Sequence, residues 1–204
     1  MIAEELTKLA LEKMKTFSIQ SVLPALRMAN QGAIEDVLNT NGCANYQWFP
    51  CLIEVIKPKQ IVELGGAMGV GSIMMLQSKY QDFKLYSITL PENKLEFSYV
   101  VDKYPNFYPI VGNDLDMNNW KDIDLSQTDL WYFDSEHTEE QLRKELGLYS
   151  PFFKKDAIVC FDDIHINDGM QKVWDEIREG KWGFSEYYDA TDPLHWSGYG
   201  VTKV

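Results

Sequence analysis

The chain is short of cysteine, of long apolar runs and of basic residues, and each shortage excludes a class of protein. Its three cysteines, Cys43, Cys51 and Cys160, are too few for a disulfide framework and too far apart for a Cys-x-x-Cys zinc site, so we expect reduced core thiols. The longest apolar runs, such as AIVCF at 157–161, are too short to cross a bilayer. Charged residues interrupt the N-terminal pattern MIAEELTKLALEKMKTF, unlike a signal peptide. We therefore expect a cytoplasmic protein with no membrane partner.

Acidic residues dominate the charge. The chain has 31 aspartates and glutamates against 19 lysines and arginines, a formal net charge of -12 at pH 7. Such a chain repels a phosphate backbone, and no Lys/Arg-rich stretch offsets this locally, so we expect no nucleic-acid partner. At 204 residues and 45% hydrophobic composition it can bury one substantial core. We expect a single domain, with an N-terminal helical segment over 1–58 and a core over 59–204.

The N-terminal third has helical periodicity. The segment 3–14 places four apolar residues on one helical face, namely Leu6, Leu9, Ala10 and Met14. A second segment, GAIEDVLNTNG at 32–42, ends on Asn and Gly, which stop helices. This N-terminal part is expected to cover a substrate site or to mediate contacts in a homo-oligomer, and the pattern does not separate the two.

From residue 60 onward short strand-like runs alternate with helical stretches. The strand-like runs lie at 60–64, 84–90, 107–111, 129–134 and 157–162, and the helical stretches near 72–80, 93–104, 138–153 and 170–179. Two final runs, 183–190 and 198–204, have only a turn-rich segment between them. We predict an α/β fold: a Rossmann-like, doubly wound, seven-stranded sheet, mostly parallel, with a C-terminal antiparallel hairpin and preceded by N-terminal helices.

The stretch IVELGGAMGVGS at 61–72 links a strand to a helix at the edge of the sheet where ligands bind. Its four glycines permit close backbone approach, and the following helix offers free N–H groups, so we expect a nucleotide-like ligand. The alternative is a tight turn without a ligand. Ala67 replaces the second glycine of a G-x-G-x-x-G pattern, which disfavours a dinucleotide.

The segment VELGGAMGVGS resembles the first motif of class I S-adenosylmethionine-dependent methyltransferases, in which an acidic residue closes the first strand. The resemblance covers roughly residues 60 to 204. It implies that Glu63 orders water and the ammonium end of S-adenosylmethionine while the glycines admit the rest of the cofactor. The cofactor-binding residues expected in this segment are Glu63, Gly65, Gly66, Gly69 and Ser72.

Two further strand ends correspond to cofactor-contacting positions of that family. The second strand usually supplies a carboxylate to the ribose hydroxyls, but Thr89 stands there. Thr89 can hydrogen-bond one hydroxyl, or Glu92 can reach back. After the third strand, Asn113 or Asp114 is expected to meet the adenine amino group, with a solvated Gly-Asn-Asp turn as the alternative.

Three aspartates follow the next two strands. Asp134 ends one strand, and Asp162 and Asp163 end the next. If these strands are neighbours, about 4.8 Å apart, the three carboxylates converge, which is costly unless a cation joins them. Oxygen ligands suit Mg²⁺, or Mn²⁺ or Ca²⁺. The alternative is that the aspartates only cap or solvate strand ends.

This arrangement resembles the metal-dependent small-molecule O-methyltransferases: the catechol enzymes and, more closely at FDDIH, the macrocin and macrolide sugar O-methyltransferases and their cephalosporin hydroxylase-like relatives. It implies that Asp134, Asp162 and Asp163 hold the metal and that His165 is the general base, since an imidazole titrates near neutral pH.

Alternatives remain at several positions. His137 also resembles a D-x-x-H element of this group, although Thr138 and Gln141 match a capping box that would make His137 a residue before a helix. His165 could equally be a surface histidine. Three further residues are candidate auxiliary ligands, Glu136, Asn167 and Asp168, and the last two also suit a helix cap. The C-terminal aromatic set is assigned no role: Trp174, Trp182, Tyr187, Tyr188, Trp196 and Tyr199, with His195 among them.

The resemblance therefore implies an S-adenosylmethionine-dependent methyltransferase that methylates a hydroxyl of a small-molecule acceptor, of sugar or natural-product type, with Mg²⁺ or another divalent cation. The alternative from another class is a non-catalytic cofactor-binding or interaction domain, since the ribose carboxylate is missing at Thr89.

Overall fold

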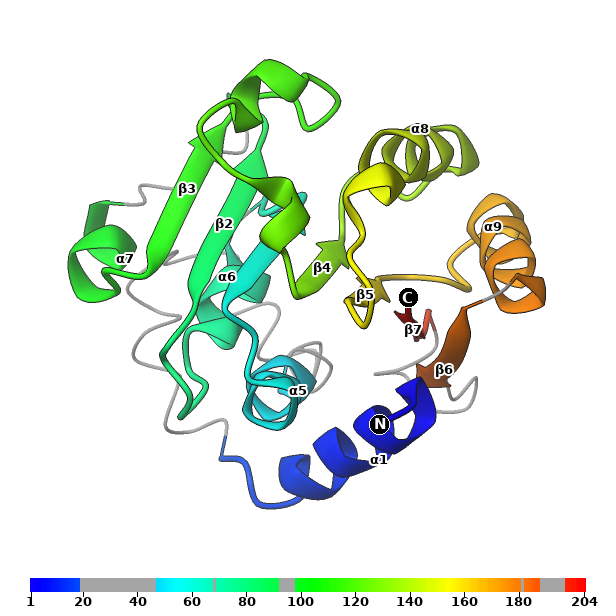
Figure 1. Ribbon diagram of the computed structural model, residues 1–204, viewed down its shortest axis with the longest axis horizontal. Helices are drawn as coiled ribbons and strands as arrows, with labels where there is room; N and C mark the ends of the chain where they lie inside the picture. Colours follow the sequence, from blue (N-terminus) through cyan, green and yellow to red (C-terminus); the bar gives the residue numbers. More distant parts are fainter. Residues whose placement is uncertain (19–46, 68, 92–97, 181, 188–196) are drawn as a thin grey trace.

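The computed structural model describes residues 1–18, 47–67, 69–91, 98–180, 182–187 and 197–204 (Figure 1). Several predictions from the sequence lie outside these residues. They concern the helix at 32–42, Cys43, Glu92, Tyr188, His195 and Trp196.

A seven-stranded sheet forms the centre of the molecule, in the order β3-β2-β1-β4-β5-β7-β6. The strands are β1 (Gln60–Leu64), β2 (Lys84–Thr89), β3 (Phe107–Val111), β4 (Leu130–Phe133), β5 (Ile158–Phe161), β6 (Gly183–Tyr187) and β7 (Tyr199–Lys203). The first five pair in parallel, and β7 pairs antiparallel with both β5 and β6. The predicted Rossmann-like fold with a terminal antiparallel hairpin is confirmed.

Helices cover both faces of this sheet. They are α1 (Ala3–Met14), α5 (Trp48–Ile56), α6 (Val70–Met75), α7 (Ser98–Lys103), α8 (Glu139–Tyr149) and α9 (Asp168–Glu179), with short 3-10 turns η3 (Met117–Trp120), η4 (Leu125–Gln127) and η5 (Ser150–Phe152). Helices α8 and α9 lie on one face, opposite α1 and α5 (Figure 1). Successive strand residues enter opposite cores: Ile61 packs with α1, α5 and α6, and Val62 packs with α8 and α9. Burial on both faces explains why the central strands β4 and β5 read as unbroken apolar runs.

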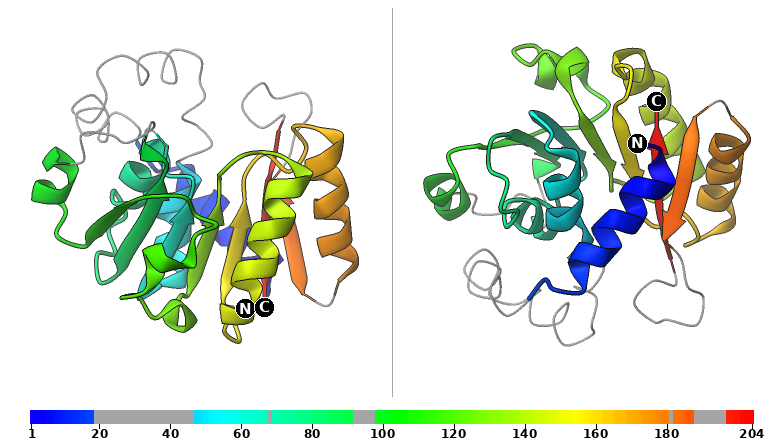
Figure 2. Two further views of the ribbon diagram at one scale, coloured as in Figure 1. Left: turned by 90° about the horizontal axis from the view of Figure 1, so that it is seen from above. Right: turned by 60° about the horizontal axis from the view of Figure 1, so that its bottom comes forward.

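Helix α1 closes the sheet beside the terminal hairpin. It packs against α5 and β6, and the two ends of the chain lie side by side, where Lys203 Nζ donates to the main-chain oxygen of Met1 at 2.8 Å (Figure 2). The predicted apolar face is wrong at Leu9, which is 45% exposed, because the buried stripe runs through Ala3, Leu6 and Ala10.

The predicted helix ends shift for local reasons. Helix α6 starts at Val70, two residues early, because Gly69 with φ +77° forms its N-cap. Helix α8 gives way to a 3-10 turn at Ser150, since Pro151 cannot continue an α-helix. Among the described residues, no helix has the length and apolar character needed to span a membrane. Cys51 and Cys160 are buried free thiols, as predicted, and burial raises the pKa of Cys51 to about 11.

Candidate cofactor and metal site

A pocket of about 430 Å³ opens at the carboxyl ends of β1, β2, β3 and β4. This is the sheet edge at which ligands bind in folds of this class. The predicted site residues that line the pocket are Gly65, Thr89, Asn113, Asp114 and Asp134, together with Glu136, a candidate auxiliary ligand. It is also lined by Ala67, Ile88, Leu90, Gly112, Ser135 and Gln141. The described lining therefore joins residues predicted to bind a cofactor to one predicted to bind a metal.

The turn after β1 passes close to its neighbours on both sides. Gly65 has φ +91°, and a Cβ placed there would lie 1.9 Å from the main-chain oxygen of Asp134. At Gly66, a Cβ would lie 2.2 Å from Ser87 Oγ. Both glycine N–H groups donate to the main-chain oxygen of Ile88, at 3.1 and 2.8 Å. Only glycine fits this path, which holds the ends of β1, β2 and β4 together.

Glu63 lies beneath this turn. It is 1% exposed, and the Ser72 hydroxyl at the start of α6 donates to its Oε2. Burial raises the pKa of Glu63, an effect that the Ser72 hydrogen bond opposes. Neither residue lines the described pocket, and Gly66 and Gly69 are likewise set back from it. Their predicted contacts with a cofactor stay predictions.

A hydrogen-bonded group of acidic and neutral side chains forms one wall of the pocket. It runs from the segment after β3 to the segment after β4 and to α8. Gln141 Nε2 donates to Asp114 Oδ2 and to Glu145 Oε1, both at 3.0 Å, and the Ser135 hydroxyl also donates to Glu145. Glu145 is 1% exposed, and its pKa is raised to about 9, first by burial and then by Asp114. The Tyr149 hydroxyl donates to the main-chain oxygen of Asp114. Hydrogen bonds within the protein thus fix this wall.

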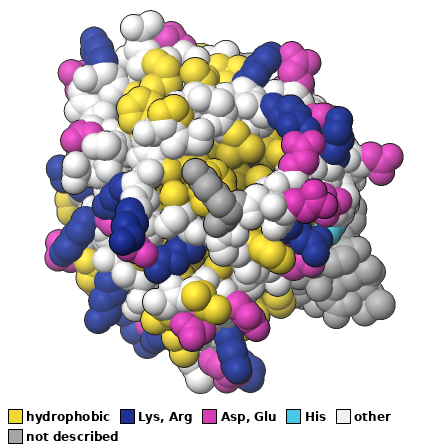
Figure 3. Space-filling view, turned by 45° about the vertical axis from the view of Figure 1, so that its right-hand side comes forward, with side chains coloured by type: hydrophobic (Ala, Val, Ile, Leu, Met, Phe, Trp, Pro, Cys, Tyr) yellow, Lys and Arg dark blue, Asp and Glu magenta, His cyan; other side chains and the backbone are white. Residues whose placement is uncertain are grey.

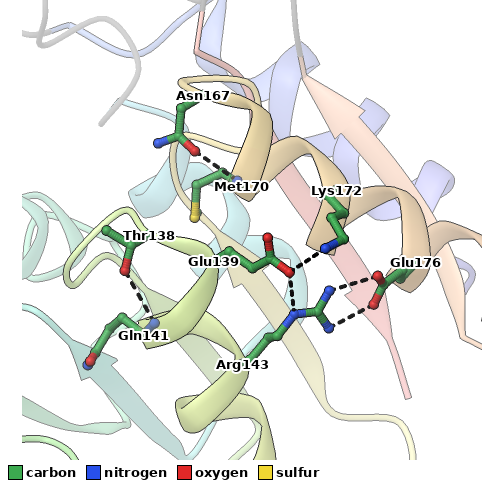
Figure 4. Close-up of polar contacts among 8 residues, drawn as sticks. All are labelled: Thr138, Glu139, Gln141, Arg143, Asn167, Met170, Lys172 and Glu176. Carbon is green, nitrogen blue, oxygen red and sulfur yellow. Dashed lines mark hydrogen bonds and ion pairs between the residues drawn. The ribbon is translucent and has the colours of Figure 1, made fainter.

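This wall was not predicted. The Thr138 hydroxyl accepts from Gln141 N at 3.2 Å, as a helix cap should, but the Gln141 side chain turns to the carboxyl groups and does not complete the predicted capping box (Figure 4). A signal was present in the sequence: Glu145 occupies the same helical stripe as the apolar residues Leu142 and Tyr149.

A second acidic group gathers at the ends of β4 and β5. Ligand atoms of Asp134, His137 and Asp162 all lie within 4.8 Å of one another. Asp162 is 5% exposed, and its pKa is raised well above the usual value by burial and by the neighbouring carboxylates of Asp134 and Asp163. Burial raises the pKa of Asp134 to about 8, although the Tyr132 hydroxyl donates to its Oδ2 at 3.0 Å. A divalent cation would relieve this crowding of buried charge.

His137 is the third member of this group, whereas the prediction named Asp163 as the third ligand. The His137 ring lies between Asp134 and Asp163. Its Nε2 lies 3.3 Å from Asp134 Oδ1, and its Nδ1 lies 3.3 Å from Asp163 Oδ2. A carboxylate on one ring nitrogen commonly orients a histidine whose other nitrogen binds a metal. Asn167 steadies the same segment: its Nδ2 donates to the main-chain oxygen of His137 at 2.8 Å, while its Oδ1 accepts from Met170 N and caps α9 (Figure 4).

His165, the predicted base, lies against other elements. Its Nδ1 contacts Gln171 of α9, and its Nε2 lies 3.7 Å from Glu186 of β6. The main chain directs it there, because Asp163 has φ +52° and His165 N donates to the main-chain oxygen of Ser197 at 2.7 Å. His165 is not one of the three grouped residues, and its role as base stays a prediction.

Ion pairs tie the two helices that follow these acidic residues. Glu139 pairs with Arg143 at 2.9 Å and with Lys172 of α9 at 2.7 Å, and Arg143 also reaches Glu176 (Figure 4). In Figure 3 this face shows basic and acidic side chains around an apolar hollow, which the side chains of α8 and α9 line together with Trp182. These ion pairs therefore hold α8 and α9 together, and each of the two helices begins shortly after a residue of the His137–Asn167 contact.

A family model described as a methyltransferase domain matches residues 62–164, the part of the chain that carries the glycine turn and all of the grouped acidic residues. Comparison with the curated proteins found no match.

Solved structures share the fold at low identity. The O-methyltransferase from Bacillus cereus in complex with SAH is 13% identical, covers 83% of this chain and 89% of its own, and has a TM-score of 0.59. The O-methyltransferase TomG from Streptomyces achromogenes, in complex with SAM, is 16% identical over 78% of this chain and 79% of its own, with a TM-score of 0.59. Aeropyrum pernix fibrillarin with natively bound S-adenosyl-L-methionine is 17% identical over 78% and 73%, also with a TM-score of 0.59.

Proposed function

The chain belongs to the methyltransferase domain family, and from this premise we propose that it transfers a methyl group from S-adenosylmethionine to a hydroxyl of a small molecule, with the help of a divalent cation. One observation carries the proposal. Asp134 both lines the pocket at the ends of β1 to β4 and belongs to the acidic group with His137 and Asp162. A methyl donor in the pocket and an acceptor at the acidic group would therefore be neighbours, as direct transfer requires.

The pocket suits the parts of S-adenosylmethionine. This cofactor supplies a methyl group on a positively charged sulfur. Thr89 would meet the ribose hydroxyls, while Asn113 and Asp114 would face the adenine. Buried Glu63 would not touch the cofactor directly. It would accept the hydrogen bond of the Ser72 hydroxyl and so hold the glycine turn on which the cofactor rests. The likeness in fold to structures that contain SAM or SAH supports this assignment.

The acidic group suits a divalent cation. Asp134, Asp162 and His137 would hold it, and Asp163 would orient the His137 ring through Nδ1. Carboxylate oxygens favour Mg²⁺ or Mn²⁺, and an imidazole nitrogen moves the preference toward Mn²⁺ and other transition metals. When bound, such a cation supplies charge that orients a hydroxyl and makes it more acidic.

The hydroxyl proton needs an acceptor in the protein. His137 has a side chain that is 27% exposed and lies within the acidic group, so it is better placed for this task than His165. Its Nε2 atom can bind a cation or take a proton, but not both at once. Where His137 holds the cation through Nε2, the base is therefore His165, as the FDDIH resemblance implies. Where oxygen ligands alone hold the cation, the base is His137.

The acceptor is proposed to be a sugar or a natural product with a free hydroxyl. The FDDIH segment at 161–165 resembles the sugar O-methyltransferases. TomG, which shares the fold, is involved in tomaymycin synthesis.

Calorimetric titration of S-adenosylmethionine into chelator-treated protein, repeated with Mg²⁺ or Mn²⁺ and with NAD as a control ligand, tests the proposal. We expect saturable binding of S-adenosylmethionine and S-adenosylhomocysteine and none of NAD. Addition of the cation alone should give a separate binding isotherm. If neither methionine-derived compound binds, the proposal fails. Binding without methyl transfer to any compound of a hydroxyl panel would favour a non-catalytic cofactor-binding domain.

A further inference from the structure

Gln141 faces the pocket with its side chain held in one orientation. Both described hydrogen bonds of that side chain leave from Nε2, toward Asp114 Oδ2 and Glu145 Oε1 at 3.0 Å each. A side-chain amide has two N–H donors and one carbonyl oxygen. Because both donors are occupied, Oε1 is the polar atom of Gln141 that remains for a ligand, and among the described residues no group donates to it.

The two acidic neighbours prevent Gln141 from turning over. A reversed amide would place its oxygen against two carboxyl oxygens, which repel it. Glu145 supports the observed orientation, because a raised pKa of about 9 leaves it protonated near neutral pH and able to share its proton with Asp114. Its Oε1 remains an acceptor for Gln141 and for Ser135. The group is therefore satisfied internally, without a cation.

The wall that results offers acceptors and apolar surface. Gln141 Oε1 and the Asp114 carboxylate accept hydrogen bonds, and Ile88 and Leu90 line the same pocket with apolar side chains. A flat apolar ring that carries an amino group matches such a wall, because the amino group donates to Gln141 Oε1. A ring with a carbonyl at the same place does not match, because the carbonyl oxygen and Gln141 Oε1 are both acceptors.

Resting on the proposed function, we infer that Gln141 determines the specificity for the base of the methyl donor: its Oε1 accepts a hydrogen bond from the exocyclic amino group of adenine. Glu145 is a positioning residue, which fixes the Gln141 amide without touching the ligand. The protein should accordingly reject the same donor when hypoxanthine replaces adenine, since that change turns a donor into an acceptor.

The test compares S-adenosylhomocysteine with S-inosylhomocysteine by calorimetry in the wild-type protein and in Gln141→Leu. The control is Gln127→Leu, the same substitution on η4, outside the described lining of the pocket. The wild type and the control should prefer the adenosyl compound by about 10- to 100-fold, the value of one or two well-placed hydrogen bonds. Gln141→Leu should lose most of this preference, mainly through weaker binding of the adenosyl compound.

Three further variants guard against a folding defect. Gln141→Asn withdraws the acceptor by one methylene and should reduce the preference as Gln141→Leu does. Glu145→Gln can donate to Asp114 and accept from Gln141, so it should keep the preference, whereas Glu145→Leu should lose it. Full preference in both Gln141 variants would overturn this inference alone. Failure of the wild type to bind S-adenosylhomocysteine would overturn the proposed function and, with it, the inference.

Discussion

Two groups of carboxyl side chains, each with one buried and one half-buried member, lie at the same edge of the sheet, and they differ in what surrounds them. Asp114 and Glu145 receive hydrogen bonds from the neutral side chains of Gln141 and Ser135. Asp134 and Asp162 lie against each other, with the Tyr132 hydroxyl and the ring of His137 as polar neighbours. Burial raises the pKa of a carboxyl in both groups, so burial alone does not distinguish a ligand site from a structural one.

The hydrogen-bond donors make the distinction. The first group has enough neutral donors to be complete within the protein, and one proton on Glu145 leaves it with a single negative charge. The second has fewer donors and, with Asp163, three carboxyl groups against two, although each group has one member that lines the pocket. We infer that a proton stabilises the first group and a cation the second. The following three predictions test that difference.

Asp162→Asn should have the largest effect, because it removes charge from the second group at nearly constant volume. We expect methyl transfer to fall about a thousandfold, since the cation contributes several kcal/mol to the reaction. Calorimetric cation binding should be lost, while S-adenosylhomocysteine binding stays within about threefold. Asp122→Asn, the same change at an exposed residue, is the control. Unaltered cation binding in Asp162→Asn would remove the second group as a metal site.

Glu145→Gln should change the pH dependence of stability. The folded protein holds the Glu145 proton up to a pKa of about 9, against 4.5 as the ordinary value, so stability is fully present below about pH 4.5 and declines as the pH rises toward 9. The slope from this one group is at most about 1.4 kcal/mol per pH unit. Urea unfolding at pH 6 and pH 9 should show a smaller decline in Glu145→Gln than in the wild type. Equal declines would mean that Glu145 is already ionised at neutral pH.

Asn167→Asp should have the smallest of the three effects. The new carboxylate still caps α9 at Met170, but it cannot donate to the main-chain oxygen of His137. We expect cation affinity to fall by about tenfold, as when support around a metal ligand is lost. The melting temperature should change little, because the cap remains. Undiminished affinity would show that His137 is held in place without Asn167.

The central strands β4 and β5 could be predicted from the sequence because burial on both faces requires unbroken apolar runs, which here end in polar residues. Helix boundaries were less accurate. The start of α6 depends on the φ angle of Gly69, and the end of α8 on Pro151. The exposed Leu9 shows the limit of periodicity in α1, since several faces of a short helix look similarly apolar until a partner such as β6 is known.

Only part of the site could be predicted, and the division has a physical reason. Parallel strands bring their carboxyl ends together, so the proximity of Asp134 and Asp162 follows from the strand order alone. The choice between His137 and His165 does not, because it depends on the turn at Asp163 and on a hydrogen bond from His165 N to Ser197, which is 32 positions further along the sequence. The Gln141 contacts join α8 to the segment after β3, and only the buried position of Glu145 in the helical stripe left a sign of them in the sequence.

The close contact between the Gly65 backbone and the Asp134 main chain fixes the distance between two proposed binding positions. A cofactor seated above Gly65 and a partner molecule anchored at Asp134 would rest on two peptide units with no room for a side chain between them. The distance between the cofactor and the partner molecule would be set by the fold before either of them binds. No domain would need to close to bring the two together. A side chain at position 65 would push the Gly65 and Asp134 segments apart and so disturb both binding positions at once.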